Sequence, residues 1–117
     1  MRYSRKILDY FHNTKHCGEL TTLHRGEAAD HSATDKVRIY LELDNDLITC
    51  ANFKAFGSVV TIVLAEYTCG MIEGKRIREC LQLTSQQLLE ALQLPMTKIH
   101  SAELIISALR QALATIR

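Results

Sequence analysis

Hydrophobic and polar residues alternate along residues 36–43, which is the pattern of a β-strand with one buried face. The apolar face consists of Val37, Ile39, Leu41 and Leu43, and the opposite face of Lys36, Arg38, Tyr40 and Glu42. The next three residues, 44–46, are of types that favour turns. A return strand is expected over residues 47–56, so the two segments predict an antiparallel hairpin. A weaker strand is predicted over residues 20–23.

Helical spacing of apolar residues marks both ends of the chain. Ser4 is a favoured N-cap residue, and it precedes a segment that we expect to be helical as far as Phe11. Near the other end, Ser101 is expected to cap a longer helix. The apolar positions of that helix are Leu104, Ile105, Ala108, Leu109, Ala112, Leu113 and Ile116. Both helices therefore have one face suited to packing against a core.

The most apolar stretch, residues 59–67, permits two interpretations. Its first five residues are all β-branched, which is compatible with a strand. Its length and flanking residues favour a buried helix that ends at Gly70. The pattern alone leaves both interpretations open.

Capping and helix-breaking residues organise the region that follows. A short helix is expected within residues 74–83. Thr84 and Gln87 have the spacing of a capping box, which predicts another helix through Leu92. Pro95, the only proline in the chain, is expected to end that region, because proline lacks a backbone N–H and biases the preceding residue away from helical conformation. We expect a short extended segment after it.

Composition and charge narrow the class of protein. The chain has 117 residues, of which 47% are hydrophobic and 23% charged, as is typical of one globular domain over residues 1–117. A net charge of +1 gives no indication of a nucleic-acid partner. No apolar run approaches a membrane span and no signal peptide is evident, so a cytoplasmic location is expected. The four cysteines lack tight metal-binding spacing and are expected to be free thiols.

Several motifs together carry a family resemblance. The sequence LPMTKIHS at residues 94–101 resembles the LPPVKIHC segment of NifU/IscU-type iron–sulfur cluster scaffolds. Tyr3-Ser4 resembles the start of that family's first helix, residues 52–58 resemble its RFKxxGC motif, and Gly74-Lys75 matches its GK. Asp35 falls at the aspartate of its ACGD motif. The resemblance implies an α+β fold with a small antiparallel sheet covered by helices, and it favours the helical interpretation of the apolar stretch.

The same resemblance identifies degenerate ligand positions. The family holds its cluster with three cysteines, and those positions here are Ala33, Ser58 and Ser101. Cluster iron needs soft thiolate ligands, so no stable cluster is expected. Asp35 and His100 remain, and two such ligands imply at most weak binding of Fe or Zn. His100 is a candidate metal ligand, and His31 is a candidate third ligand. Local chemistry alone favours a loop side chain for His31 and a solvent-facing side chain for His100.

The resemblance also implies partners rather than enzymatic activity. The family docks a cysteine desulfurase and an Hsp70-type chaperone, and the chaperone-binding segment here is Leu94, Pro95, Met96, Thr97 and Lys98. Met96 and Thr97 depart from the family's Pro and Val. We therefore expect an adaptor, regulator or weak iron binder of cluster assembly. The alternatives are an active iron- or zinc-binding scaffold that uses Asp35, His100 and a non-standard ligand, and, with least support, hydrolase-like catalysis by Ser58 with His100.

Overall fold

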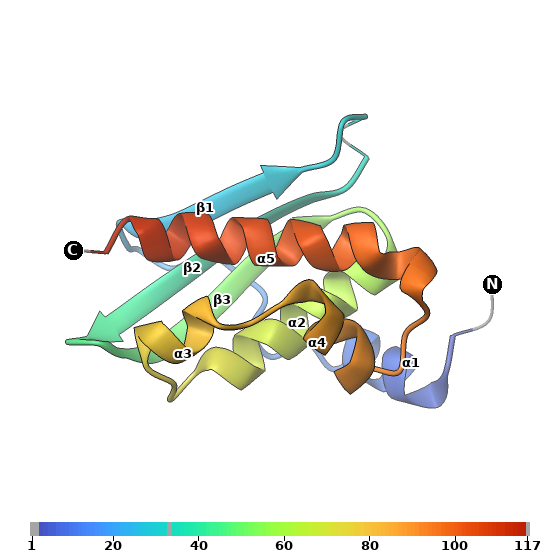
Figure 1. The fold of residues 1–117 in the computed structure, drawn as a ribbon, viewed down its shortest axis with the longest axis horizontal. Helices are drawn as coiled ribbons and strands as arrows, with labels where there is room; N and C mark the ends of the chain where they lie inside the picture. The colour runs from blue at the N-terminus through green and yellow to red at the C-terminus, as the bar shows by residue number, and fades with distance from the viewer. Residues whose placement is uncertain (1–2, 33, 117) are drawn as a thin grey trace.

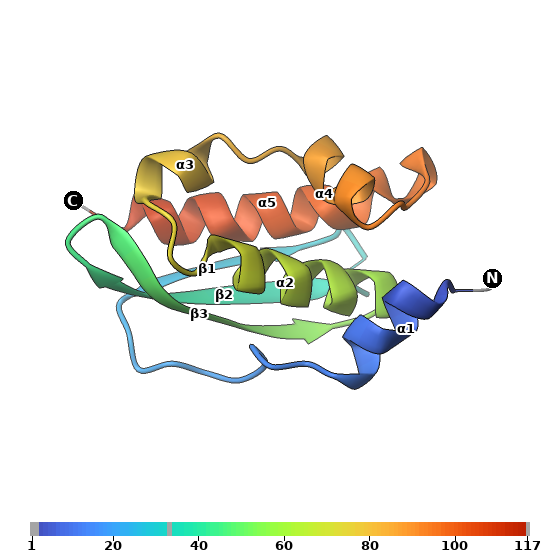
Figure 2. The ribbon, with the colours of Figure 1, turned by 90° about the horizontal axis from the view of Figure 1, so that it is seen from below.

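The computed structural model describes residues 3–32 and 34–116, and in that part the chain forms a three-stranded antiparallel sheet in the order β1-β2-β3 (Figure 1). The elements are α1 (Arg5–His12), β1 (His24–Ala29), β2 (Lys36–Asp44), β3 (Leu47–Phe56), α2 (Val59–Ile72), α3 (Ile77–Leu81), α4 (Ser85–Ala91), the 3-10 turn η1 (Met96–Lys98) and α5 (Ile99–Ala114). Helices α2 and α5 cover one face of the sheet, and α3 and α4 lie outside them (Figure 2). The α+β architecture is the one predicted.

The predicted hairpin is confirmed. Strand β2 pairs with β3 in antiparallel register, and the turn between them places Asn45 at φ 56°. Tyr40 lies on the predicted face with Arg38, whose guanidinium donates to the Tyr40 hydroxyl at 3.4 Å, but it is only 1% exposed. The segment between α1 and β1 runs along that side of the sheet (Figure 2), and its Thr22 hydroxyl donates to the carbonyl of Leu41 at 2.7 Å. This contact depends on tertiary packing and leaves no pattern in the strand itself.

The first strand was predicted four residues too early. It spans His24–Ala29 rather than residues 20–23, and Leu23 is 89% exposed. Strand β1 follows the register of β2 and is covered by α5, whose backbone lies directly over Gly26. Close approach by the helix, and not an alternating pattern, therefore fixes this strand.

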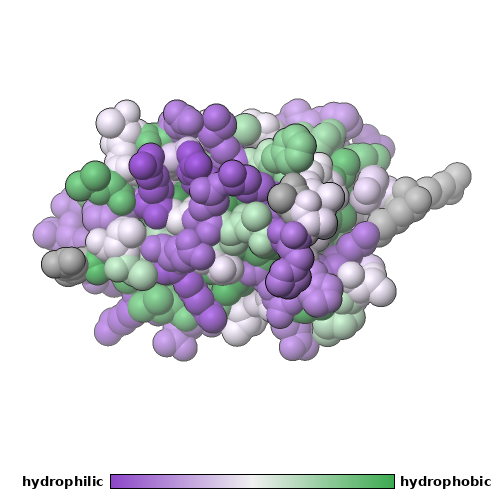
Figure 3. Space-filling view, turned by 90° about the horizontal axis from the view of Figure 1, so that it is seen from above, coloured by the Kyte–Doolittle hydropathy of each residue, from purple (hydrophilic) through white to green (hydrophobic). Residues whose placement is uncertain are grey.

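The free side of β1 is protected by polar side chains. The view from above shows hydrophilic residues crowded over this part of the molecule (Figure 3). The carboxylate of Glu27 pairs with Lys36 at 2.8 Å and with Arg38 at 3.1 Å, and the backbone N–H of Glu27 donates to Gln111 Oε1 at 3.3 Å. Charges and a capped backbone group discourage the pairing of a further strand here.

Most of the predicted helices are confirmed, with shifted ends. Ser4 caps α1 by accepting from the backbone N–H of Ile7 at 3.2 Å. The apolar stretch is helical, and α2 continues two residues past Gly70 to Ile72. Thr84 caps α4 in a capping box, and α3 is a short helix within the expected range.

The start of the last helix differs from the prediction. Pro95 is extended, at φ −72° and ψ 158°, but the residues after it form the 3-10 turn η1, which continues directly into α5. Lys98 is therefore the N-cap, and Ser101 lies inside the first turn instead of capping it. Pro95 stands just before the turn, where its missing backbone N–H removes no hydrogen bond from the turn. Its carbonyl accepts from the backbone N–H of Lys98 at 3.0 Å.

The core fills the space between the sheet and helices α2 and α5. Its largest fully buried side chains include Phe53, Ile39, Leu41, Leu64, Leu88, Ile105 and Leu109. Cys17, Cys50, Cys69 and Cys80 are free thiols, and burial raises the pKa of Cys80 to about 11. Among the described residues, no helix has the length and apolarity needed to cross a bilayer.

Candidate functional site

The sequence-predicted site residues meet at one surface hollow. A depression of about 800 Å³ lies between the start of α5 and the segment that joins β1 to β2. It is lined by His31, Asp35, His100 and Ser101, together with Glu27, Asp30 and Glu103 from the surrounding elements. Ser58 adjoins it through Asp35, whereas Ala33 lies outside the described residues. Residues far apart in the chain thus line one hollow.

Asp35 is engaged at the N-terminus of α2. Its Oδ1 accepts from the backbone N–H of Ser58 at 3.1 Å, and its Oδ2 accepts from the hydroxyls of Thr61 at 2.7 Å and Ser58 at 3.4 Å. The hydroxyl of Ser58 in turn accepts from Thr61 N at 3.3 Å, which makes Ser58 the N-cap. A carboxylate at this end of a helix also interacts favourably with the helix dipole. Asp35 and Ser58 therefore act together as a helix cap.

Gly57 makes this close approach possible. Its φ is +134°, and a Cβ atom at this position would overlap the carboxylate of Asp35. Both features require glycine. The segment just before Asp35 is also held in place. Asp30 accepts from the backbone N–H of Thr34 at 2.8 Å and from the Thr34 hydroxyl at 2.6 Å. The hydrogen bond from the Thr34 hydroxyl holds the pKa of Asp30 below its ordinary value.

The histidines of this hollow are not directed at a common point. The side chain of His100 is 92% exposed, and its Nδ1 lies 3.2 Å from Glu103 Oε1 one turn along α5. His31 is also exposed. Within residues 3–32 and 34–116, no three His, Cys, Asp or Glu side chains are grouped as a metal would require. Ser58 pairs with Asp35 and Thr61 rather than with His100, so these two residues do not form a nucleophile and base.

The chaperone-like segment is accessible in part. Pro95, Met96 and Thr97 are exposed, with Met96 at 59%, whereas Leu94 and Lys98 are half-buried. Met96 is thus not a core residue, and Leu94 packs against the edge of the core. Three consecutive side chains of the segment are available to a partner.

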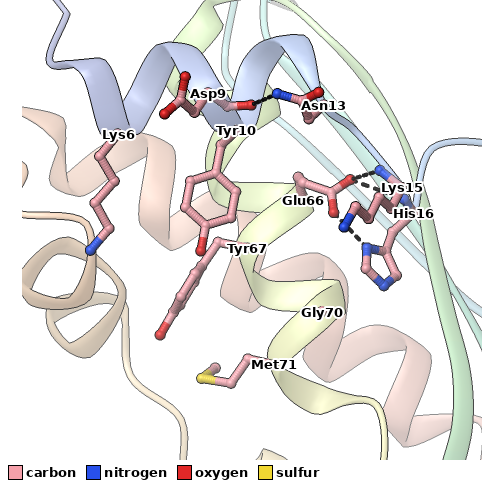
Figure 4. Close-up of a pocket in the computed structure, with 10 residues that line it drawn as sticks. All are labelled: Lys6, Asp9, Tyr10, Asn13, Lys15, His16, Glu66, Tyr67, Gly70 and Met71. Atoms are coloured by element: carbon pink, nitrogen blue, oxygen red, sulfur yellow. Dashed lines mark hydrogen bonds and ion pairs between the residues drawn. The ribbon is translucent and has the colours of Figure 1, made fainter.

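Sequence reasoning missed a second and larger hollow, of about 880 Å³, between α1 and α2 (Figure 4). The rings of Tyr10 and Tyr67 form its wall, with centroids 6.0 Å apart in an edge-to-face arrangement. At its other end His16 meets Glu66, a residue that is only 4% exposed. The signal in the sequence was a single carboxylate in the middle of an apolar helix, which indicates a buried partner.

Both ring nitrogens of His16 contact carboxylates. Nδ1 lies 2.5 Å from Glu66 Oε2, and Nε2 lies 2.9 Å from Glu73 Oε1. Burial lowers the pKa of His16, but the hydrogen bonds and charges of the two glutamates outweigh burial and raise the pKa above its ordinary value. The imidazolium form therefore predominates in this cluster at a higher pH than for an exposed histidine.

Comparison with known proteins agrees with the family resemblance and the fold. The family described as NifU-like N terminal domain matches residues 2–117. The iron–sulfur cluster assembly scaffold protein IscU 1 of Archaeoglobus fulgidus is 31% identical over 113 residues, covering 95% of this chain and 74% of the relative. The scaffold protein IscU of Rickettsia prowazekii is 27% identical over 119 residues, covering 97% and 91%.

Solved structures share the fold. A crystal structure from Fervidobacterium islandicum, described as a cluster assembly scaffold for the SUF system, superposes with a TM-score of 0.77 at 20% identity, covering 95% of this chain and 96% of the other. The N-terminal part of a NifU-like protein from Brucella abortus gives 0.61 at 13% identity, covering 97% and 83%. The family match extends over nearly the whole chain and includes the motifs identified above. The chain belongs to the NifU-like N-terminal domain family of iron–sulfur cluster scaffolds.

Proposed function

We propose that this protein serves iron–sulfur cluster assembly as an adaptor or regulator that docks other assembly proteins without holding a cluster itself. The observation that carries the proposal is the helix cap formed by Asp35 and Ser58. Two positions that the resemblance assigns to cluster binding are occupied by side chains whose polar atoms satisfy the N-terminus of α2.

The chemistry of the residues supports the same conclusion. A serine hydroxyl is neutral near pH 7 and is a poor ligand for cluster iron, and an alanine supplies no ligand atom. The three soft anionic ligands of the family are therefore all absent here, because their positions hold Ala33, Ser58 and Ser101. His100 points toward solvent and pairs with Glu103, so it does not compensate for their loss.

Reconstitution with iron and sulfide tests this proposal. We expect the wild-type protein, incubated anaerobically with both, to show no charge-transfer absorption after desalting. The matched control is the triple variant Ala33→Cys/Ser58→Cys/Ser101→Cys, which restores three thiolates and is expected to gain that absorption. A stoichiometric cluster on the desalted wild-type protein would overturn the proposal.

Weak binding of Fe or Zn by Asp35 and His100 is the alternative function. It is supported by the shared hollow that these residues line with His31. Metal analysis of the same samples distinguishes the two functions. Metal retained by the wild-type protein and lost in His100→Ala supports the alternative, and metal retained equally by both does not.

The proposed partners are a cysteine desulfurase and an Hsp70-type chaperone. The exposed stretch Pro95–Thr97 supports chaperone docking, because a peptide-binding groove accepts accessible apolar side chains such as Met96. We expect full-length protein to bind the assembly chaperone, and Lys98→Ala to weaken binding about tenfold, a loss on the order of 1.4 kcal/mol. Thr115→Ala, at the far end of α5, is the control. Binding that is absent, or indifferent to Lys98, would count against retained chaperone recognition.

A further inference from the structure

We propose that His16 is a proton-controlled latch, which holds residues 13–18 against the outer edge of β3 and releases them when it loses its proton. The latch joins three parts of the molecule: the segment after α1, helix α2 and strand β3. It involves none of the residues of the cap at Asp35, so it goes beyond the proposed function.

The segment is attached to α2 through Glu66. One oxygen of this carboxylate accepts from the backbone N–H groups of Lys15 at 2.8 Å and His16 at 3.0 Å, and the other contacts the imidazole (Figure 4). Glu66 is therefore surrounded by three donors from two consecutive residues. A nearly buried carboxylate is stable only with such partners.

The same segment covers the edge of β3. Phe53 N donates to His16 O at 2.7 Å, and Gly18 N donates to Phe53 O at 2.8 Å, which forms a short parallel bridge around Cys17. Glu73, the second partner of the imidazole, accepts from the backbone N–H of Ala51 at 2.9 Å. The outward-facing amides of two alternate residues of β3 thus depend on the latch. Edge amides without partners are sites for pairing with another strand.

The proton is needed because both ring nitrogens face carboxylate oxygens. A neutral imidazole has one N–H and one lone pair, so one of the two contacts would become repulsive. Loss of the proton would also leave Glu66 and Glu73 as two neighbouring carboxylates without the cation between them. The closed arrangement therefore requires imidazolium.

Other charged and titratable groups near His16 do not replace it. They are Glu66 from α2, Glu73 directly after α2, Cys50 from β3, Cys69 from the buried face of α2, Lys15 from the same segment, and Lys6 and Asp9 from α1. Burial and Glu73 raise the pKa of Cys50, and burial raises that of Cys69 further, so neither thiol carries charge near neutral pH. Imidazole is the group in this set whose ordinary pKa, about 6.5, is close to neutral.

The direction of the pH effect follows from the raised pKa of His16. Closing the latch raises the pKa of the imidazole, so its contribution is fully present below about pH 6.5, the ordinary value. The contribution is lost as pH rises through the raised pKa. The latch is closed at low pH and opens as the pH rises through this pKa.

Amide hydrogen exchange of the full-length protein tests the latch. We expect the protection factors of Phe53 and Gly18, corrected for the intrinsic pH dependence of exchange, to fall at least tenfold across the titration of His16 followed by NMR. The amide of Ile39, in the central strand, serves as the control and should keep its protection.

Two variants make the test specific. Glu73→Gln replaces one carboxylate by an amide, whose N–H can donate to the unprotonated ring nitrogen, so it should reduce the fall in Phe53 protection. His16→Gln should abolish the pH step and leave Phe53 weakly protected throughout. If His16→Gln fails to fold, the wild type and Glu73→Gln still decide the matter. Protection of Phe53 that is indifferent to the His16 titration, or a His16 pKa at or below 6.5, would overturn the proposal.

Discussion

Replacing Gly26 by alanine is expected to destabilise the protein by about 3 kcal/mol or more, at the upper end of overpacking substitutions. A Cβ atom at this position would overlap the carbonyl oxygen of Ala108 and the backbone nitrogen of Ala112, and would lie 2.7 Å from Gln111 Cβ. The obstructing atoms belong mainly to the backbone of α5, so no side chain can rotate away. The helix itself would have to move off β1.

Urea denaturation followed by circular dichroism measures this loss. The matched control is Gly70→Ala, which adds the same methyl group to an exposed helical position where it meets only the His16 ring, at 3.3 Å. Alanine favours helix over glycine by about 1 kcal/mol, which offsets part of the cost of displacing the His16 ring, so this variant should lose much less stability than Gly26→Ala. Equal effects of the two substitutions would show that the contact between α5 and Gly26 is looser than described.

Replacing Glu66 by alanine is expected to cost about 3 kcal/mol, the lower end of the range for breaking a buried ion pair. The substitution leaves the N–H groups of Lys15 and His16 without their acceptor and removes one of the two carboxylates that stabilise the imidazolium.

Thermal and urea unfolding near pH 6, where the ion pair is complete, measure the effect. Glu73→Ala is the control within the same cluster, because its side chain is 30% exposed compared with 5% for Glu66, and it accepts one backbone N–H instead of two. We expect the control to lose about 1 kcal/mol, as for one ordinary hydrogen bond. A Glu66→Ala variant as stable as Glu73→Ala would contradict a buried role for Glu66.

The elements that the sequence could predict are those whose signals are local. The alternation in β2, the turn at Asn45 and the capping residues Ser4 and Thr84 each act within a few residues, and each was found where expected. The family motifs extended this reach, because they favoured the helical interpretation of the stretch that forms α2.

The errors fall where distant segments decide the local structure. Strand β1 has no clear alternation and is fixed by its pairing with β2 and by α5 above Gly26. Ser101 was expected to cap α5, but the helical turn begins earlier, in η1, so Lys98 is the N-cap. Tyr40 lies on the predicted face of β2, but tertiary packing leaves it only 1% exposed.

The sequence by itself determined the family, the composition of the degenerate ligand set and most of the regular elements, because side-chain chemistry and periodicity are properties of the chain alone. Tertiary structure decided what the remaining polar residues do. Asp35 became a helix cap because Gly57 lets its carboxylate approach Ser58 and Thr61. The pKa of His16 is raised because folding places its two ring nitrogens between carboxylates 50 and 57 positions away along the chain, and no local pattern records that encounter.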